Sequence, residues 1–230
     1  MSGSVDEISK KCEIYSKIDW DSFETSWGFE KLPLLEHNSN LTNSYGIYRE
    51  GCREVTFKMK ELEEENNRLF IEAYGLLDKL TPEVPDEQIT LFANPKYRYG
   101  GKLSEEELEK RFKEDTIQEL ISYSVGCMMG RYSLDEPGLI YAHSGNEGFD
   151  PSKYRTFKAD DDGLIPISDF AWFDDDVAER FFKFIETVWD KNTLEENLDF
   201  AAEAIDRKSS ESSREAIRRF FCNDFFKDHL

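Results

Sequence analysis

The sequence has few residues of the kinds that hold metals or form disulfide frameworks. Its 230 residues include four cysteines and only three histidines, at positions 37, 143 and 229. The cysteines stand far apart, at positions 12, 52, 127 and 222, without a Cys-x-x-Cys pair or a histidine at ligand spacing. These absences exclude the common zinc folds and predict no metal site. Cys127, inside an apolar run, is expected to be a buried thiol.

Long apolar runs and positive charge are also scarce. No apolar stretch approaches the 18 residues of a membrane helix. Lysine and arginine total 29 against 49 aspartates and glutamates, a formal net charge of -20. A DNA-binding module normally has the opposite sign, because phosphate contacts supply most of its non-specific affinity. The sequence therefore predicts a cytoplasmic protein that binds DNA poorly alone, whose acidic surface serves either solvation or a basic partner.

Residues 45–76 carry a heptad-like pattern. Apolar residues recur in alternating steps of three and four, with charged residues between them. This predicts a helix on the order of 45 to 50 Å long. Gly46 and Gly51 weaken its first turns, so its well-formed part is expected from Arg53. Asn66 falls on the seam, where it either fixes the register with a partner helix or fills a partly exposed polar gap.

A second long helix is predicted from Ser104 to about Arg131. Ser104 and Glu107 have the spacing of a capping box, which satisfies two backbone N–H groups at a helix start. Two long helices joined by a loop are expected to pack antiparallel. Leu62 and Leu69 should then lie in the interface with the second helix.

The remaining segments complete a mainly α prediction. Residues 88–92 are the best strand candidate, and an irregular acidic connector follows at 135–176. Three helices are then expected: one at 177–188 with Asp174 as N-cap, one capped by Thr193 and Glu196, and one capped by Ser212 and Glu215. The predicted fold is a long antiparallel helix pair with a small extended segment and a C-terminal helical cluster. Its parts are a long-helix spacer region at 1–134 and the connector with a helical subdomain at 135–230, which together can form one continuous domain.

Two stretches carry a family resemblance, and they read ISYSVGCMMGRYSLDEPGLI at residues 121–140 and ENNRLFIEAYGL at residues 65–76. In the first stretch Gly126 and Gly130 leave room for another segment to come close, which predicts a tightly packed junction. Both stretches resemble the PglX family, adenine-specific DNA methyltransferases of BREX phage-defence systems, and related restriction-methylase fusions. The resemblance extends over most of the chain.

The resemblance implies a role within a longer protein. Members of the family are much longer, and their S-adenosylmethionine and Asn-Pro-Pro-Tyr motifs lie in a catalytic domain that should precede this segment. The parent would transfer a methyl group from S-adenosylmethionine to adenine N6 in a specific DNA sequence. This segment would be a non-catalytic part without a cofactor, joining the catalytic domain to the target-recognition regions, with DNA reached through the parent. The alternative is an acidic protein-interaction module that docks other defence components.

Two motifs resemble known chemical sites. Asn94-Pro95-Lys96-Tyr97 is similar to Asn-Pro-Pro-Tyr, but Lys96 replaces the second proline and no Gly-x-Gly cofactor loop accompanies it, so a turn is favoured. The run at 160–163, Asp-Asp-Asp-Gly, is similar to a calcium loop. Lys158 would then occupy its first ligand position, so a solvated acidic turn is favoured. We therefore predict no catalytic, cofactor-binding or metal-binding residue in the segment.

Basic and aromatic residues interleave at residues 97–102, in a loop that includes two glycines. Such a loop can contact phosphates and stack on bases, which makes Arg98, Tyr99 and Lys102 candidate DNA contacts. Arg131, in the family-like stretch, is a fourth candidate. The alternatives are an ordinary loop and, for Arg131, a residue that closes its helix C-terminus.

Overall fold

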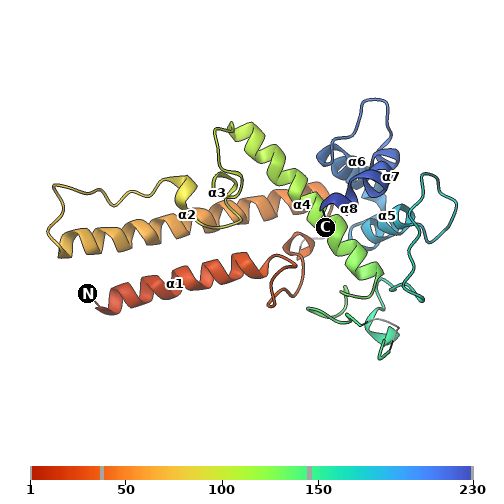
Figure 1. Ribbon diagram of the computed structural model, residues 1–230, viewed down its shortest axis with the longest axis horizontal. Helices are drawn as coiled ribbons and strands as arrows, with labels where there is room; N and C mark the ends of the chain where they lie inside the picture. Colours follow the sequence, from red (N-terminus) through yellow and green to blue (C-terminus); the bar gives the residue numbers. More distant parts are fainter. Residues whose placement is uncertain (1, 37–38, 144–146, 229–230) are drawn as a thin grey trace. The chain divides into compact units, whose positions relative to one another are not determined.

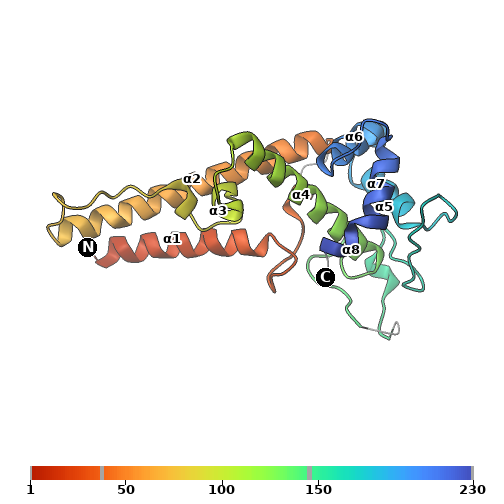
Figure 2. The same ribbon diagram turned by 45° about the horizontal axis from the view of Figure 1, so that its top comes forward.

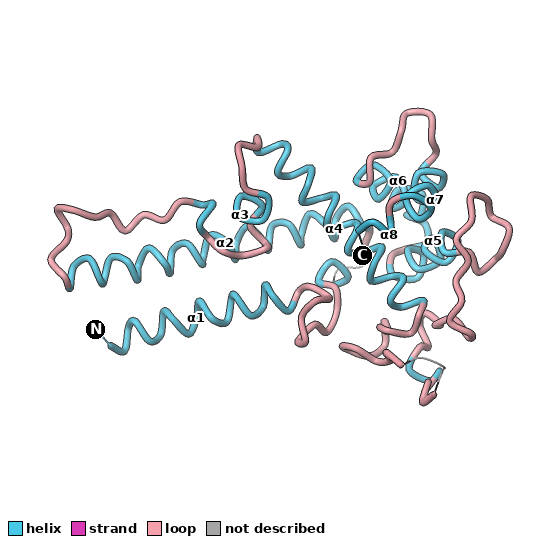
Figure 3. The backbone as a smooth tube through the Cα atoms, in the orientation of Figure 1, coloured by secondary structure: helices cyan, strands magenta, loops and turns pink. Residues whose placement is uncertain are grey.

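The computed structural model describes residues 2–36, 39–143 and 147–228, and all regular secondary structure in this part of the chain is helical (Figures 1 and 3). The mainly α prediction is confirmed. The predicted strand at 88–92 is wrong, because these residues end a 3-10 turn and continue as bends and turns. The α-helices are α1 (Ser2–Asp21), α2 (Leu41–Ala73), α3 (Pro95–Tyr99), α4 (Glu105–Met128), α5 (Val177–Val188), α6 (Leu194–Ala204), α7 (Ser213–Asn223) and α8 (Phe225–Asp228). The 3-10 turns are η1 (Pro33–Glu36), η2 (Asp86–Gln88), η4 (Pro151–Lys153) and η5 (Lys191–Thr193).

The chain divides into two compact units that are both discontinuous in sequence. Unit 1 contains residues 1–27 and 47–109, and unit 2 contains residues 28–46 and 110–230. Neither unit ends at residue 134, where the sequence analysis placed a boundary, because α2 and α4 each contribute residues to both units. No described helix combines the length and apolarity that crossing a membrane requires.

In unit 1 the helix that runs beside α2 is α1, in the opposite direction (Figures 1 and 2). The seam predicted on α2 is present, since Cys52 and Met59 are buried and Leu62 and Leu69 are partly buried. The sequence analysis had assigned the 104–131 helix as the partner of this seam. The antiparallel partner visible in unit 1 is instead α1, a helix that the sequence analysis did not predict.

The extended segment after α2 returns along the same helix. The Asn67 side chain donates a hydrogen bond to the Pro82 carbonyl (3.2 Å), and Val84 N–H donates to the Glu64 carboxylate (3.2 Å). Polar groups from α2 therefore bind a backbone that has no sheet partner. This explains how an extended segment lies on a helix without forming a strand.

The helix starts test the capping predictions directly. The Ser104 capping box is confirmed, because Ser104 N–H donates to Glu107 (2.8 Å) and Glu107 N–H donates to Ser104 (3.2 Å). The box at Ser212 and Glu215 is also confirmed. The N-cap of α5 is Asp176, not Asp174, and Thr193 precedes α6 without a side-chain cap hydrogen bond. The Thr193 hydroxyl is instead directed backward, where it donates to the carbonyl of Asp190 (2.7 Å), the N-cap of η5.

Unit 2 has an aromatic core. The rings of Phe181 and Phe221 lie 5.9 Å apart between α5 and α7, and Tyr123 of α4 lies 6.4 Å from Phe184. All four side chains are fully buried. The helical cluster predicted for the end of the chain is therefore built around phenylalanines spaced three and four residues apart.

Candidate nucleic-acid contact site

The Asn94 side chain holds the turn that starts α3. Its Oδ1 atom accepts a hydrogen bond from Lys96 N–H (3.2 Å), and its Nδ2 atom donates to the carbonyls of Asp86 (2.7 Å) and Ile89 (2.9 Å). The residue is only 3% exposed. Both amide protons and the carbonyl oxygen are thus used within the fold. This geometry favours the interpretation of Asn94 to Tyr97 as a turn and helix cap, because the Asn-Pro-Pro-Tyr chemistry requires an asparagine that faces a substrate.

The candidate DNA-contact residues Arg98 and Tyr99 lie in a cluster of aromatic rings in unit 1. The Arg98 guanidinium carbon is 5.4 Å from the centre of the Phe23 ring, 6.0 Å from Phe92 and 5.6 Å from Tyr99. Phe92 also contacts the rings of Trp20 (6.4 Å), Phe23 (5.5 Å) and Tyr97 (6.4 Å). We call this group, made of Trp20, Phe23, Phe92, Tyr97, Arg98 and Tyr99, the Arg98 cluster.

Asp19 of α1 holds the backbone of the Arg98 cluster at Phe92 and Ala93. The Asp19 carboxylate accepts hydrogen bonds from Phe92 N–H (2.7 Å) and Ala93 N–H (2.8 Å). Burial raises the pKa of Asp19, and the two backbone donors and the Arg98 charge oppose that rise. A buried carboxylate is tolerated at this position because its oxygens accept hydrogen bonds, which offset the cost of removing it from water. Asp19 therefore fixes the turn that presents the ring of Phe92.

Several rings of the cluster remain open to solvent. Trp20, Phe92 and Tyr97 are 39% to 49% exposed. Half-exposed rings beside a guanidinium can stack on bases and contact phosphate, the chemistry of single-strand binding platforms. Lys102 is exposed and follows Gly100 and Gly101, both with positive φ. Arg131, the fourth candidate, is exposed but belongs to unit 2.

The cluster members from the end of α1, the residues just after it and the turn before α3 were not predicted from the sequence. Trp20, in the last turn of α1, and Phe23, two residues after its end, stand three residues apart, and Trp27 follows four residues later. This spacing of aromatic residues at a helix end was a usable signal. The contribution of Phe92 was hidden by its assignment to a strand.

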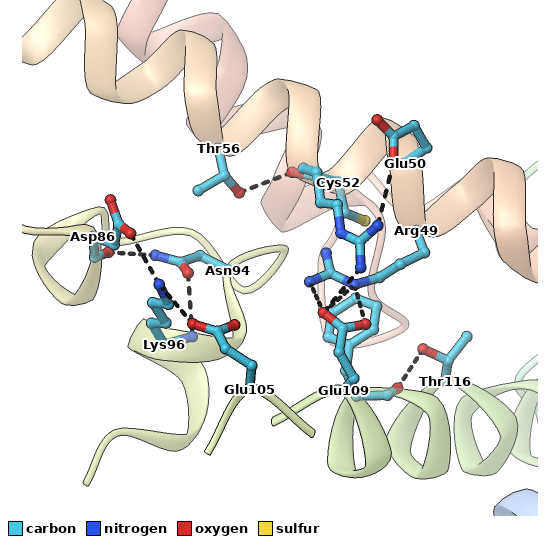
Figure 4. A network of polar contacts seen from close by, with 12 residues as sticks. Arg49, Glu50, Cys52, Thr56, Asp86, Asn94, Lys96, Glu105, Glu109 and Thr116 are labelled. Carbon is cyan, nitrogen blue, oxygen red and sulfur yellow. Dashed lines mark hydrogen bonds and ion pairs between the residues drawn. The ribbon is translucent and has the colours of Figure 1, made fainter. Parts of the chain in front are cut away.

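A polar groove of about 550 Å³ lies in the same unit, lined by residues of α2, η2, α3 and the first turn of α4 (Figure 4). Arg49 forms a two-pronged ion pair with Glu109, with distances of 2.9 Å from Nε to Oε2 and 2.5 Å from Nη2 to Oε1. Asp86 binds the ammonium groups of Lys60 (2.6 Å) and Lys96 (3.0 Å). Lys96 also reaches Glu105 (2.9 Å).

The charges in this groove compensate one another. The Arg49 guanidinium lowers the pKa of Glu109, and the Lys60 and Lys96 ammonium groups lower the pKa of Asp86. Conversely, Glu105 and Asp86 raise the pKa of Lys96. Cations that already hold carboxylates are poor anchors for an external phosphate. The groove therefore works as a clamp that fixes η2, α3 and the start of α4 on α2.

The glycines of the family-like stretch lie in close packing in unit 2. A Cβ atom on Gly126 would stand 2.6 Å from Cδ2 of Tyr132, whose ring stacks on Tyr123 at 5.2 Å. Gly130 has φ of +75°, and its carbonyl accepts a hydrogen bond from the Tyr154 hydroxyl (2.6 Å). Gly126 therefore leaves the space that the Tyr132 ring occupies, and Gly130 adopts a backbone conformation that residues with a side chain rarely adopt.

The Asn66 carbonyl oxygen is buried on α2 and accepts no hydrogen bond from the described residues.

Asp160 accepts hydrogen bonds from Asp162 N–H (3.2 Å) and Gly163 N–H (3.0 Å) and pairs with Arg180 (3.5 Å). The residues at 160–163 therefore form a turn closed by its own first aspartate.

Metal-binding side chains do not gather in the described ranges. No three histidine, cysteine or acidic side chains within 2–36, 39–143 and 147–228 are placed to hold one ion. His143 is exposed, and the other two histidines, His37 and His229, lie outside the described residues. All four cysteines are free thiols, and Cys127 is buried as expected.

Comparison with known proteins gives the family context of this geometry. No protein-family model matches the chain. The adenine-specific methyltransferase BrxX of Escherichia coli O9:H4 (strain HS) is 43% identical over 235 residues, which cover 98% of this chain and 19% of BrxX. The adenine-specific methyltransferase PglX of Lacticaseibacillus casei (strain Zhang) is 37% identical over 239 residues, which cover 100% of this chain and 18% of PglX. The chain thus spans about a fifth of the length of these relatives. It is homologous over its whole length to one segment of the adenine-specific methyltransferases BrxX and PglX, as the resemblance at residues 65–76 and 121–140 had indicated.

Proposed function

We propose that this chain is a non-catalytic structural segment of a larger DNA adenine N6-methyltransferase that acts in the cytoplasm and uses S-adenosylmethionine. In that protein it joins the catalytic domain to the regions that recognise the DNA target. The observation that carries the proposal is the similarity of the entire chain to about a fifth of two adenine-specific methyltransferases. The remaining four-fifths of such a protein has room for the cofactor site and the target-recognition regions.

The architecture of unit 1 supports a positioning role. The 33 residues of α2 correspond to a helix of about 50 Å at 1.5 Å per residue. In unit 1, α1 runs beside this helix, and the returning extended segment is hydrogen bonded to its last turns (Figures 1 and 2). A helix held on more than one side resists bending better than a single helix, so it can keep two flanking regions at a fixed spacing.

The Arg98 cluster supplies the contact with DNA in this proposal. Its exposed aromatic rings and the exposed Lys102 offer stacking and one phosphate contact, while most of the chain surface is acidic. Such a site adds little affinity alone and serves mainly to orient DNA, including unpaired bases, that other regions of the parent hold. In the full-length methyltransferase, Lys102→Ala should reduce the slope of log K against log salt by about 1, because one phosphate contact is lost.

Cofactor titration tests the non-catalytic part of the proposal. Calorimetric titration of S-adenosylmethionine into the purified segment should show no micromolar binding, and the segment should not methylate DNA. Circular dichroism on the same sample shows whether the helices are formed, so a negative titration refers to the folded state. Micromolar cofactor binding by the folded segment would overturn the proposal.

A further inference from the structure

A loop at residues 159–176 in unit 2 holds large apolar side chains in solvent. Leu164, Ile167, Phe170, Trp172 and Phe173 are all exposed, and Trp172 is exposed by 74%. We call these five side chains the 164–173 patch. The rings of Phe170 and Trp172 meet edge to face with centroids 6.4 Å apart. Single exposed apolar residues are ordinary, but five within ten residues of one loop are typical of a protein interaction site.

The shape of this loop is held by polar contacts rather than by the patch. Asp176 is completely buried and pairs with Arg218 at 2.7 Å. Ser168 donates to Asp176 (2.7 Å), and its carbonyl accepts from Arg218 (3.1 Å). Val177 N–H donates to the Pro166 carbonyl (2.9 Å), which closes the loop on itself. The fold of the loop therefore does not require the exposed apolar side chains, and their exposure needs a different explanation.

Charge defines what can cover the patch. Residues 159–176 contain seven aspartates and no lysine or arginine. Arg180 pairs with Asp160, and Arg218 pairs with Asp176. The remaining aspartates of the loop are exposed: Asp161, Asp162, Asp169, Asp174 and Asp175. This charge repels nucleic acid and anionic lipid and attracts a basic surface.

We propose that the 164–173 patch docks a lysine- and arginine-rich segment of a separate protein. Trp172 and its neighbouring rings pack against apolar side chains and the alkyl stems of the basic residues, and the five aspartates pair with their charges. Aromatic residues at the centre of an interface carry much of its binding energy. Carboxylates are costly to bury in a permanent contact, so this surface suits a partner that binds reversibly and leaves it solvated when free. The surface is formed within unit 2, so it exists whether or not the chain acts as a spacer.

Site-specific crosslinking in the full-length protein identifies the occupant. A photoreactive amino acid replaces Leu164, an exposed member of the 164–173 patch, and crosslinking is performed in cells. Mass spectrometry then identifies the crosslinked peptide. The proposal predicts a peptide from a different protein with a clear excess of lysine and arginine. A crosslink only to the parent chain, to a second copy, to nucleic acid or to an acidic segment overturns it, as does the absence of any crosslink.

Titration of the identified peptide, synthesised and labelled, tests the assigned residues. Trp172→Ala should weaken its binding to the full-length protein about thirtyfold or more, the effect of losing a central aromatic anchor. Asp174→Asn with Asp175→Asn should slow association and flatten its salt dependence. Trp27→Ala removes an even more exposed tryptophan from unit 1 and should leave binding unchanged. Equal effects of Trp172→Ala and Trp27→Ala would overturn the assignment.

Discussion

Gly126→Ala tests whether the family-like stretch is a close-packed junction. The added Cβ atom would lie 2.6 Å from Cδ2 and 3.0 Å from Cε2 of Tyr132, distances that real Cβ contacts do not tolerate. Tyr132 has little freedom to move away, because it is 5% exposed and its ring contacts Tyr123 at 5.2 Å and Phe29 at 5.3 Å. Overpacking of this kind typically costs about 1 to 3 kcal/mol. The better helix propensity of alanine offsets about 1 kcal/mol.

Gly46→Ala is the matched control for this substitution. Gly46 is also inside a helix and belongs to the same unit, but a Cβ atom there would meet nothing within 4 Å. The propensity gain is then unopposed, so this variant should be more stable than the wild type by about 0.5 to 1 kcal/mol. The difference between the two variants isolates the packing cost of about 1 to 3 kcal/mol. Urea unfolding followed by circular dichroism measures both. Equal free energies of unfolding for the two variants would refute the close contact, and Gly126→Leu should be more destabilising than Gly126→Ala.

The ion-pair clamp of unit 1 gives further predictions, all measurable by urea unfolding. Lys96→Ala should cost up to about 1 kcal/mol, more than an ordinary turn residue, because its ammonium group holds both Asp86 and Glu105; no measurable loss would contradict this. Glu109→Gln should cost about 1 to 3 kcal/mol, because Arg49, whose side chain is only 9% exposed, loses a charged two-pronged partner; stability equal to the wild type would show that the pair is dispensable. The pKa of Glu109 is lowered in the folded state, so its stabilising effect is complete above the unfolded pKa of about 4.3 and is lost as pH falls through the folded value. The wild type should therefore lose more stability than Glu109→Gln below about pH 4, and parallel acid profiles would contradict the pKa assignment.

The long helices could be predicted because their signals are local. The seam of α2 follows from a regular spacing of apolar residues, and the start of α4 follows from the Ser104 and Glu107 pair. The same seam signal exists in α1, where Val5, Ile8, Cys12, Tyr15 and Asp19 form the less exposed stripe at steps of three and four. Two of these positions carry polar or thiol groups, which hid the pattern from a search for apolar residues. Without α1, the sequence analysis assigned the wrong partner to the α2 seam.

The strand prediction failed because alternation alone does not make a strand. Ile89 and Leu91 are buried and Thr90 and Phe92 are exposed, so the expected period of two is real. A strand also requires a neighbour for its backbone groups. Here the Asp19 carboxylate takes the N–H group of Phe92, and Leu91 N–H donates to the nearby Ile89 carbonyl (2.9 Å). A long-range side-chain acceptor of this kind has no local signal in the sequence.

The candidate site was predictable only in part for the same reason. Arg98, Tyr99 and Lys102 were found because they are adjacent in the chain. Trp20 and Phe23 join them only through the packing of α1, more than 70 positions earlier. Competition between caps was equally invisible, since Asp176 rather than Asp174 starts α5 through its contact with Arg218 and its bond to Ala178 N–H (3.0 Å).

The central claim is that this chain positions the working parts of a methyltransferase without forming its cofactor site. The most direct test replaces residues 5–228 of the full-length methyltransferase with a flexible glycine-serine linker and measures both S-adenosylmethionine binding and DNA adenine methylation. The account predicts that cofactor affinity stays within about twofold of the wild type, a difference of about 0.4 kcal/mol, because the segment contributes no residue to the cofactor site. Site-specific methylation should be lost. Retained methylation would show that the segment is dispensable, and lost cofactor binding would show that it belongs to the cofactor site; either result would contradict the account.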